Sequence, residues 1–143
     1  MEHLCYTRGM DVKRTGGAVY NINYHLVWCP KYRAAVLTGA VAERLLELFG
    51  EIAEKRGLDI LASEVMPDHV HLFVAAPPKY SPADLAKLFK GITSRRLHQE
   101  LSGQIRSKIR KPGTLWAPSY YAGSAGNVSG EAIKRYIEEC QHL

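Results

Sequence analysis

The sequence lacks paired cysteines, and this absence limits both its cross-linking and its metal chemistry. Its three cysteines, Cys5, Cys29 and Cys140, are odd in number and far apart, and no two form a C-x-x-C pair. A disulfide framework and a zinc knuckle both require such pairs, so the sequence predicts neither. This cysteine usage is typical of a protein from a reducing compartment.

Long apolar runs are also absent. No stretch approaches the roughly 18 consecutive apolar residues that a membrane-spanning helix needs. The first ten residues, MEHLCYTRGM, lack the apolar centre of a signal peptide. We therefore expect a cytoplasmic protein with no membrane partner.

Acidic residues are scarce in one part of this 143-residue chain, whose net charge is +5 and whose pI is about 9.2. Between residues 81 and 121, eight lysines and arginines stand against only Asp84 and Glu100. Such an excess favours a polyanionic partner such as nucleic acid or anionic lipid. A basic surface that merely keeps the protein soluble is the alternative. The eight cations are Lys87, Lys90, Arg95, Arg96, Arg106, Lys108, Arg110 and Lys111.

The order of apolar patterns predicts one domain, residues 18–143, after a flexible N-terminal tail at residues 1–17. The predicted strands are 19–28, 58–66, 69–76 and 115–122. The predicted helices are 38–56, a second that begins at Ser81, and a third from Gly130 to about Cys140, with a basic loop at 103–113. The order β-α-β-β-α-β-α matches an α+β, ferredoxin-like (RRM-like) sandwich, an antiparallel sheet with helices on one face, plus a C-terminal helix that carries Tyr136.

His69 and His71 form a short His-x-His pattern on the third predicted strand. Residues i and i+2 of a strand point to the same face, which places these two Cα atoms roughly 6.5–7 Å apart. Two imidazoles at this separation can hold one divalent ion and leave positions open for a substrate phosphate. Nitrogen ligands favour manganese or another transition ion. Two half-buried histidines that only bond to their neighbours are the alternative, because H-x-H is common by chance.

Tyr136 lies on the last predicted helix, on the same face as Ile133, Ile137 and Cys140. The simplest interpretation is a core aromatic. The functional alternative is a nucleophile, which would need a nearby cation because a phenol has a pKa near 10. Attack on a DNA phosphate exchanges one phosphodiester for another, so the step is reversible and needs no ATP.

Five segments together resemble the single-tyrosine transposases of small insertion sequences, the TnpA type of the His-hydrophobic-His nuclease superfamily. They follow the family order and cover nearly all of the chain after residue 17. Relatives that process genomic repeats share this resemblance, and the sequence does not separate them from an active transposase. The segments are YHLVWCPKYR at 24–33, EVMPDHVHL at 64–72, KGITSRRL at 90–97, LWAPSYY at 115–121 and IKRYIE at 133–138.

The resemblance implies a transposase that cleaves and rejoins single-stranded DNA through a covalent 5′-phosphotyrosine. It assigns Tyr136 as the nucleophile and His69 and His71 as ligands of Mg²⁺ or Mn²⁺, with no small-molecule cofactor. It also implies a homodimer that binds DNA hairpins at the ends of the element, with the active site formed within one subunit or across two.

The sequence does not identify the third metal ligand. The family commonly has a glutamine four residues after the tyrosine. Here Cys140 occupies that position, and Gln141 follows it. On a regular helix, Cys140 lies about 40° from Tyr136 and Gln141 about 140° away. Gln141 serves only if the helix frays or bulges at its end; Cys140, Glu139 or water are the alternatives.

The resemblance also implies a DNA-binding surface. Basic side chains that contact phosphates position the DNA without reading its sequence. Trp116, Tyr120 and Tyr121 are candidates for stacking on bases, with core packing as the alternative. The expected phosphate contacts are Lys31, Arg33, Lys90, Arg95 and Arg96.

Two other functions fit parts of the pattern. A non-catalytic ferredoxin-like nucleic-acid-binding module would bind without cleavage and ignore chelators, although the strand at 69–76 lacks the aromatic pair such modules use for stacking. A metal phosphodiesterase that acts through water would not need Tyr136.

The Tyr136→Phe substitution separates these functions. It removes the attacking oxygen, so it should abolish the covalent protein–DNA adduct while leaving DNA binding intact. Adduct formation is measured on a denaturing gel after incubation with single-stranded hairpin DNA and manganese. A Phe variant that still forms the adduct would show that another residue attacks.

Overall fold

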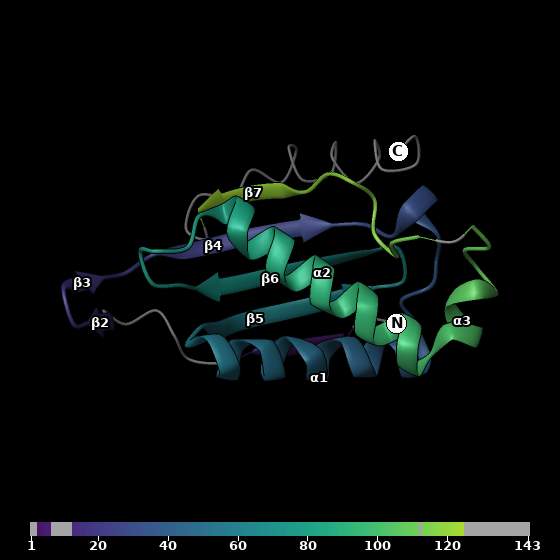
Figure 1. The fold of residues 1–143 in the computed structure, drawn as a ribbon, viewed down its shortest axis with the longest axis horizontal. Helices are drawn as coiled ribbons and strands as arrows, with labels where there is room; N and C mark the ends of the chain where they lie inside the picture. Colours follow the sequence, from purple (N-terminus) through teal and green to yellow (C-terminus); the bar gives the residue numbers. More distant parts are fainter. Residues whose placement is uncertain (1–2, 7–12, 112, 125–143) are drawn as a thin grey trace.

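The computed structural model describes residues 3–6, 13–111 and 113–124, and it places two long helices over one face of an antiparallel sheet (Figure 1). The five strands are ordered β1-β5-β6-β4-β7. A separate two-stranded sheet, β2 and β3, lies at one end of the molecule. The strands are β1 (His3–Tyr6), β2 (Lys13–Thr15), β3 (Ala18–Tyr20), β4 (Asn23–Trp28), β5 (Asp59–Met66), β6 (His69–Ala75) and β7 (Tyr121–Ser124). The helices are the 3₁₀ turn η1 (Lys31–Arg33), α1 (Gly39–Arg56), α2 (Pro82–Glu100) and the short α3 (Ser102–Arg106).

The element order β4-α1-β5-β6-α2-β7 is the β-α-β-β-α-β unit of the ferredoxin-like fold. The predicted fold class is therefore confirmed. The additional C-terminal helix with Tyr136 was predicted for residues that lie outside the described ranges.

The core lies between the sheet and the two long helices. Val70, Leu72 and Val74 of β6 are fully buried in it, and each contributes about 1.5–3 kcal/mol through burial. A slip of β6 by one residue would replace these side chains in the core with those that face the other way, which include His69 and His71, so the core fixes the register of the strand. Large buried neighbours include Leu26, Trp28, Leu45, Phe49, Leu85 and Phe89.

Local sequence signals define the ends of both helices. Gly57 ends α1 in the left-handed conformation, with φ of 68°. At the start of α2, the Ser81 hydroxyl accepts from the Asp84 backbone N–H, and the Asp84 carboxylate accepts from the Ser81 N–H, each at 3.0 Å. This capping box satisfies two otherwise unpaired N–H groups.

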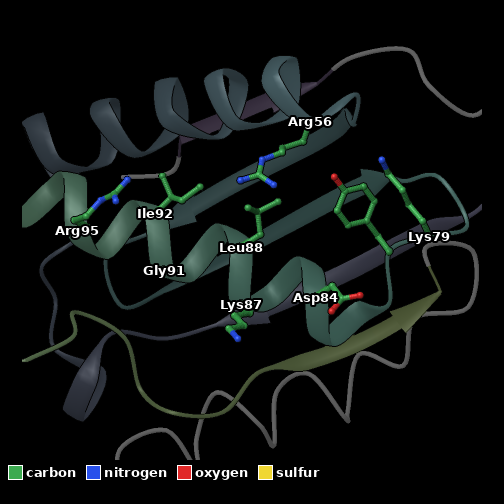
Figure 2. Close-up of a pocket in the computed structure, with 9 residues that line it drawn as sticks. Arg56, Lys79, Asp84, Lys87, Leu88, Gly91, Ile92 and Arg95 are labelled. Carbon is green, nitrogen blue, oxygen red and sulfur yellow. The ribbon is translucent and has the colours of Figure 1, made fainter.

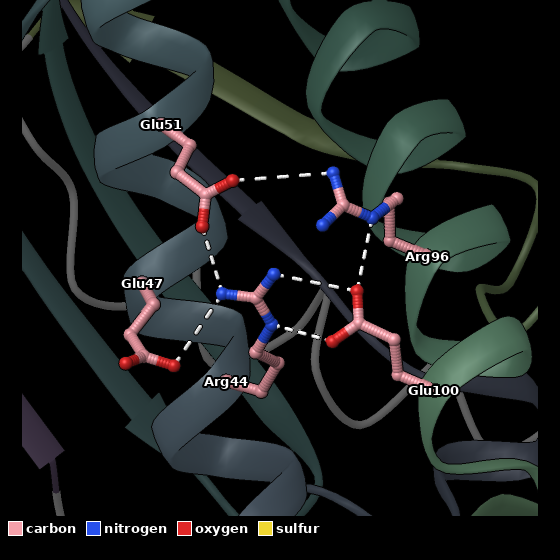
Figure 3. Close-up of polar contacts among 5 residues, drawn as sticks. All are labelled: Arg44, Glu47, Glu51, Arg96 and Glu100. Carbon is pink, nitrogen blue, oxygen red and sulfur yellow. Dashed lines mark hydrogen bonds and ion pairs between the residues drawn. The ribbon is translucent and has the colours of Figure 1, made fainter.

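Ion pairs connect α1 to α2 on the outer surface (Figure 3). Arg44 contacts Glu100 at 2.6 Å and Glu51 at 2.7 Å, and it reaches Glu47 at 3.5 Å. Arg96 contacts Glu100 at 2.9 Å and Glu51 at 3.9 Å. Exposed pairs contribute roughly 0–1 kcal/mol each, so this network orients the helices more than it stabilises them.

Residues 1–17 were expected to form a flexible tail, and the structure corrects this for two segments. β1 pairs antiparallel with the edge of β5, and β2 pairs with β3. Neither segment has a strong apolar pattern, so pairing to a neighbouring strand decides its conformation rather than local propensity. The domain boundary at residue 17 stays a prediction.

Three predicted elements differ in detail. The strand predicted at 19–28 is interrupted at residues 21–22 and forms β3 and β4. The basic loop at 103–113 begins with α3, whose Ile105 is fully buried. The strand predicted at 115–122 is wrong before Tyr121, because Pro118 has no N–H for a ladder. A backbone bridge between Pro30 and Trp116 holds that segment instead.

A matched test of backbone strain uses Gly50, inside α1, and Gly57, the residue that follows its last turn. Both are exposed, and a Cβ added to either would meet no atom within 4 Å, but only Gly57 has a positive φ. Gly57→Ala should lower the free energy of unfolding by about 1–2 kcal/mol. Gly50→Ala, in the helix interior, should raise it by about 0.5–1 kcal/mol. Urea unfolding measures both, and effects of the same sign would contradict the assignment of the helix end.

Candidate active site

The face of the sheet turned away from α1 and α2 carries a cluster of histidines. His69 and His71 project from β6 on this face, because Val70 and Leu72 between and after them are buried in the core. Their ring centroids lie 5.1 Å apart, with the ring planes at 77°. Their side chains are 15% and 16% exposed, so both are accessible to a small ion.

The ring of His69 is held by a carboxylate. Its Nδ1 lies 2.8 Å from Oδ1 of Asp68, and the other oxygen of Asp68 accepts a 2.6 Å hydrogen bond from Nε of Arg33. Burial alone would raise the pKa of the Asp68 carboxyl, but the hydrogen bonds from Arg33 and His69 outweigh it and keep that pKa below its ordinary value. An ionised Asp68 keeps the proton of neutral His69 on Nδ1 and leaves Nε2 with a lone pair.

The ring of His71 has neighbours on both nitrogens. Its Nδ1 lies 3.0 Å from Nε2 of His25, and its Nε2 lies 3.9 Å from Oε1 of Glu64 on β5. Burial, followed by the nearby charges of His69 and His25, lowers the pKa of His71 to about 4. His71 is therefore neutral near pH 7, as a metal-binding imidazole must be.

Sequence reasoning missed His25, which is 1% exposed. It lies on β4 opposite Phe73, and the two rings stack at 4.1 Å with 4° between their planes. Burial lowers the pKa of His25 to about 4. The alternation of Leu26 and Trp28 onto the core face could have placed His25 on the opposite face, but the pairing of β4 with β6 is not readable from sequence.

These residues fit part of a divalent-metal site. His69 and His71 each have a partner on Nδ1, which leaves Nε2 available to an ion, as is usual for metal-binding histidines. Within the described ranges, no group of three or more His, Cys, Asp or Glu side chains is arranged to hold a metal. Tyr136 and the candidate third ligands Glu139, Cys140 and Gln141 lie outside those ranges.

Three of the expected phosphate contacts have partners inside the protein. Arg33 holds Asp68, and Arg96 belongs to the ion-pair network of Figure 3. Lys90 donates to the backbone oxygens of Ala117 at 2.8 Å and Ser119 at 3.0 Å, which fastens the irregular segment before β7 to α2. If these three side chains contact DNA, they must do so while also keeping, or after giving up, their hydrogen bonds within the protein.

Arg95 lines a cleft of about 620 Å³ on the helix face of the molecule (Figure 2). Arg56, Lys79 and Lys87 also line it, against the single carboxylate of Asp84. The excess positive charge makes this cleft attractive to a phosphate backbone. It lies across the sheet from the histidine cluster, because Val70 and Leu72 face the helices and His69 and His71 alternate to the other face.

Of the two interpretations of Trp116, the structure supports core packing. Its side chain is 1% exposed, and its Nε1–H donates to Oγ1 of Thr93 at 3.0 Å. Its ring packs edge-on against Trp28 at 5.8 Å. Tyr121 is half-buried and lies edge-on to His25 at 5.9 Å, and Tyr120 is also half-buried.

The described part of the chain contains no helix long and apolar enough to cross a membrane.

Comparisons with known proteins agree on one family. The family model described as "Transposase IS200 like" matches residues 18–140. The ISDra2 transposase TnpA of Deinococcus radiodurans is 40% identical over 133 residues, which are 93% of each chain. The transposase for insertion sequence element IS200 of Salmonella typhimurium is 28% identical over 132 residues, 90% of this chain and 86% of that one.

Solved structures show the same similarity. A crystal structure described as a transposase of Deinococcus radiodurans R1 has a TM-score of 0.78 and 38% identity, over 92% of this chain and 98% of that one. A REP-associated tyrosine transposase bound to a REP hairpin has a TM-score of 0.54 over 96% of this chain and 73% of that one. At 15% identity, the second similarity concerns the fold alone.

The two buried histidines predict how stability depends on pH. Because the pKa values of His25 and His71 are about 4 in the folded protein and near 6.5 when unfolded, the unfolded chain binds more protons between these limits. The free energy of unfolding should therefore fall as the pH drops from 7 to 4, by on the order of 3 kcal/mol per histidine at most.

Urea unfolding of the metal-free protein at several pH values measures this loss. His25→Phe removes one of the two groups, so the loss should be about half as large in that variant. Equal stability at pH 7 and pH 4.5 would contradict the burial of neutral histidines.

Proposed function

The chain belongs to the IS200-like transposase family, so it is a DNA-cleaving and strand-transferring enzyme, and from this premise we propose which of its residues act on the DNA. We propose that it cleaves and rejoins single-stranded DNA, with Mg²⁺ or Mn²⁺, through a 5′-phosphotyrosine on Tyr136. The observation that carries this proposal is the pair of imidazoles on β6, each with Nδ1 occupied by a fixed partner.

In this proposal, His69 and His71 hold the divalent ion through Nε2. A third ligand comes from Gln141, Cys140, Glu139 or water. When bound, the ion acts as a Lewis acid toward a phosphoryl oxygen. The mixed nitrogen and oxygen donors suit manganese at least as well as magnesium.

The chain's own residues carry out the transfer. The phenolic oxygen of Tyr136 forms a bond to phosphorus, and the bond from phosphorus to the 3′ oxygen breaks. The phenol gives its proton to water, and the departing 3′ oxygen takes up a proton from water. One phosphodiester replaces another, so a 3′ hydroxyl can later attack the phosphotyrosine and release the enzyme.

Arg33 and Asp68 keep His69 oriented while this happens. The carboxylate of Asp68 accepts from Nδ1 of His69 at 2.8 Å, and Arg33 anchors its other oxygen. Fixing the ring in advance avoids reorganisation during the reaction. Arg33 therefore supports the site through Asp68 as well as being a candidate phosphate contact.

We propose that the substrate carries a hairpin and that two copies of the chain act together. The REP-associated relative of the same fold is bound to a REP hairpin, which supports a hairpin ligand here. The basic cleft of Figure 2 supplies a surface for its backbone, with Arg95 the first candidate contact. Four further residues are candidate phosphate contacts for DNA that extends beyond the cleft: Lys31, Arg33, Lys90 and Arg96.

The proposal is tested with a labelled single-stranded hairpin oligonucleotide. The wild-type protein should form a covalent adduct in manganese and none in excess chelator. His69→Ala should reduce the rate of adduct formation by about 1,000-fold, equivalent to roughly 4 kcal/mol. The control is His98→Ala. His98 lies on α2, where its ring bonds to the Ser94 carbonyl, and its loss should leave full activity.

Two results would overturn parts of the proposal. Hairpin binding with no adduct under any metal condition would indicate a non-catalytic binding module. An adduct that forms equally well in chelator would remove the metal from the reaction while leaving Tyr136 in place.

A further inference from the structure

We propose that His25 is a positioning residue: its Nε2 accepts the Nδ1 proton of His71 and so directs the Nε2 lone pair of His71 toward the divalent ion. This inference rests on the proposed function, in which His71 is a metal ligand. The contact that carries it is the 3.0 Å separation between the two ring nitrogens.

Only one proton can occupy this contact. If His71 donates from Nδ1, its Nε2 carries a lone pair and can bind a metal ion. If His25 donates instead, Nδ1 of His71 becomes the acceptor, and neutral His71 must carry its proton on Nε2. The direction of a single hydrogen bond therefore decides whether His71 can serve as a ligand.

The ring of His25 is held in the position that this bond requires. It is 1% exposed and lies parallel to Phe73 at 4.1 Å, with 4° between the planes. Tyr121 of β7 lies edge-on to it at 5.9 Å. A ring confined by neighbours on two strands has little freedom to move its Nε2 away from His71.

The two candidate ligands have matching arrangements with different partners. His69 has the ionised carboxylate of Asp68 on its Nδ1, and His71 has a neutral imidazole in the corresponding place. Such outer partners set the tautomer and orientation of metal-binding histidines, and their loss typically costs 10–100-fold in metal affinity. A neutral imidazole suits the buried position of His25 better than a carboxylate would, because an unpaired carboxylate would be costly there. In the proposed tautomer the proton of His25 lies on Nδ1, which is buried and has no hydrogen-bond partner among the described residues.

The competing interpretation is that His25 only packs against Phe73. Phenylalanine would then replace it without consequence, because the stack and the burial survive. His25→Gln separates the two interpretations, because Oε1 of glutamine lies three bonds from Cβ, as Nε2 of histidine does, and can accept the same proton. The two variants thus keep either the ring or the acceptor.

The first measurement is the affinity of the full chain for Mn²⁺, by calorimetric titration near pH 7.5. We expect His25→Phe to raise the Kd by about 10–100-fold and His25→Gln to stay within about threefold of wild type. Thermal unfolding of each metal-free variant checks that it is folded. Equal Mn²⁺ affinity for wild type and a folded His25→Phe would overturn the inference.

The second measurement is the tautomer of His71 in the metal-free protein. Long-range ¹H–¹⁵N spectra of histidine-labelled protein, assigned with a His71→Ala variant, should show the proton on Nδ1 in wild type and a shift toward Nε2 in His25→Phe. A wild-type His71 protonated on Nε2 would overturn the inference. Failure of wild type to bind Mn²⁺ would instead overturn the proposed metal site, and the tautomer would still decide the role of His25.

Discussion

The proposed chemistry of this protein depends on the alternation of side chains along β6. Val70, Leu72 and Val74 are fully buried against the helices, and this burial fixes which residues face the other way. His69 and His71 are brought together by a strand that has no freedom to slip. The apolar core thus positions a polar site although the two have no side chain in common. The positions of the two histidines are set by the packing of the core.

Each histidine is then oriented by a residue from a different part of the chain. Asp68 comes from the turn before β6 and is held by Arg33 of η1, whereas His25 comes from the neighbouring strand β4. The site therefore forms only when the sheet and the η1 turn are both in place. The basic cleft lies on the opposite face of the sheet, so the surface proposed to contact DNA and the face that carries the histidines are separate.

Much of the fold was readable from the sequence because its signals are local. The cap at Ser81, the left-handed Gly57 and the spacing of the α1 core residues each act within a few positions of the chain. The pairing of β1 with β5, the bridge between Pro30 and Trp116 that replaces the first part of the strand predicted at 115–122, and the contact of His25 with His71 depend on residues far apart in sequence. Alternation predicts a face, but only the register of two strands determines which residues on that face meet.

The η1 turn has a consequence for how the site responds to change. Tyr32 and Arg33 are consecutive residues with φ of 59° and 52°, a left-handed conformation that is unfavourable for residues other than glycine. The same Arg33 holds Asp68, and Asp68 holds His69. The backbone of the turn and the orientation of the imidazole are therefore thermodynamically linked. If one ligand changes the conformation of the turn and a second binds the imidazole, each changes the protein's affinity for the other by the same factor.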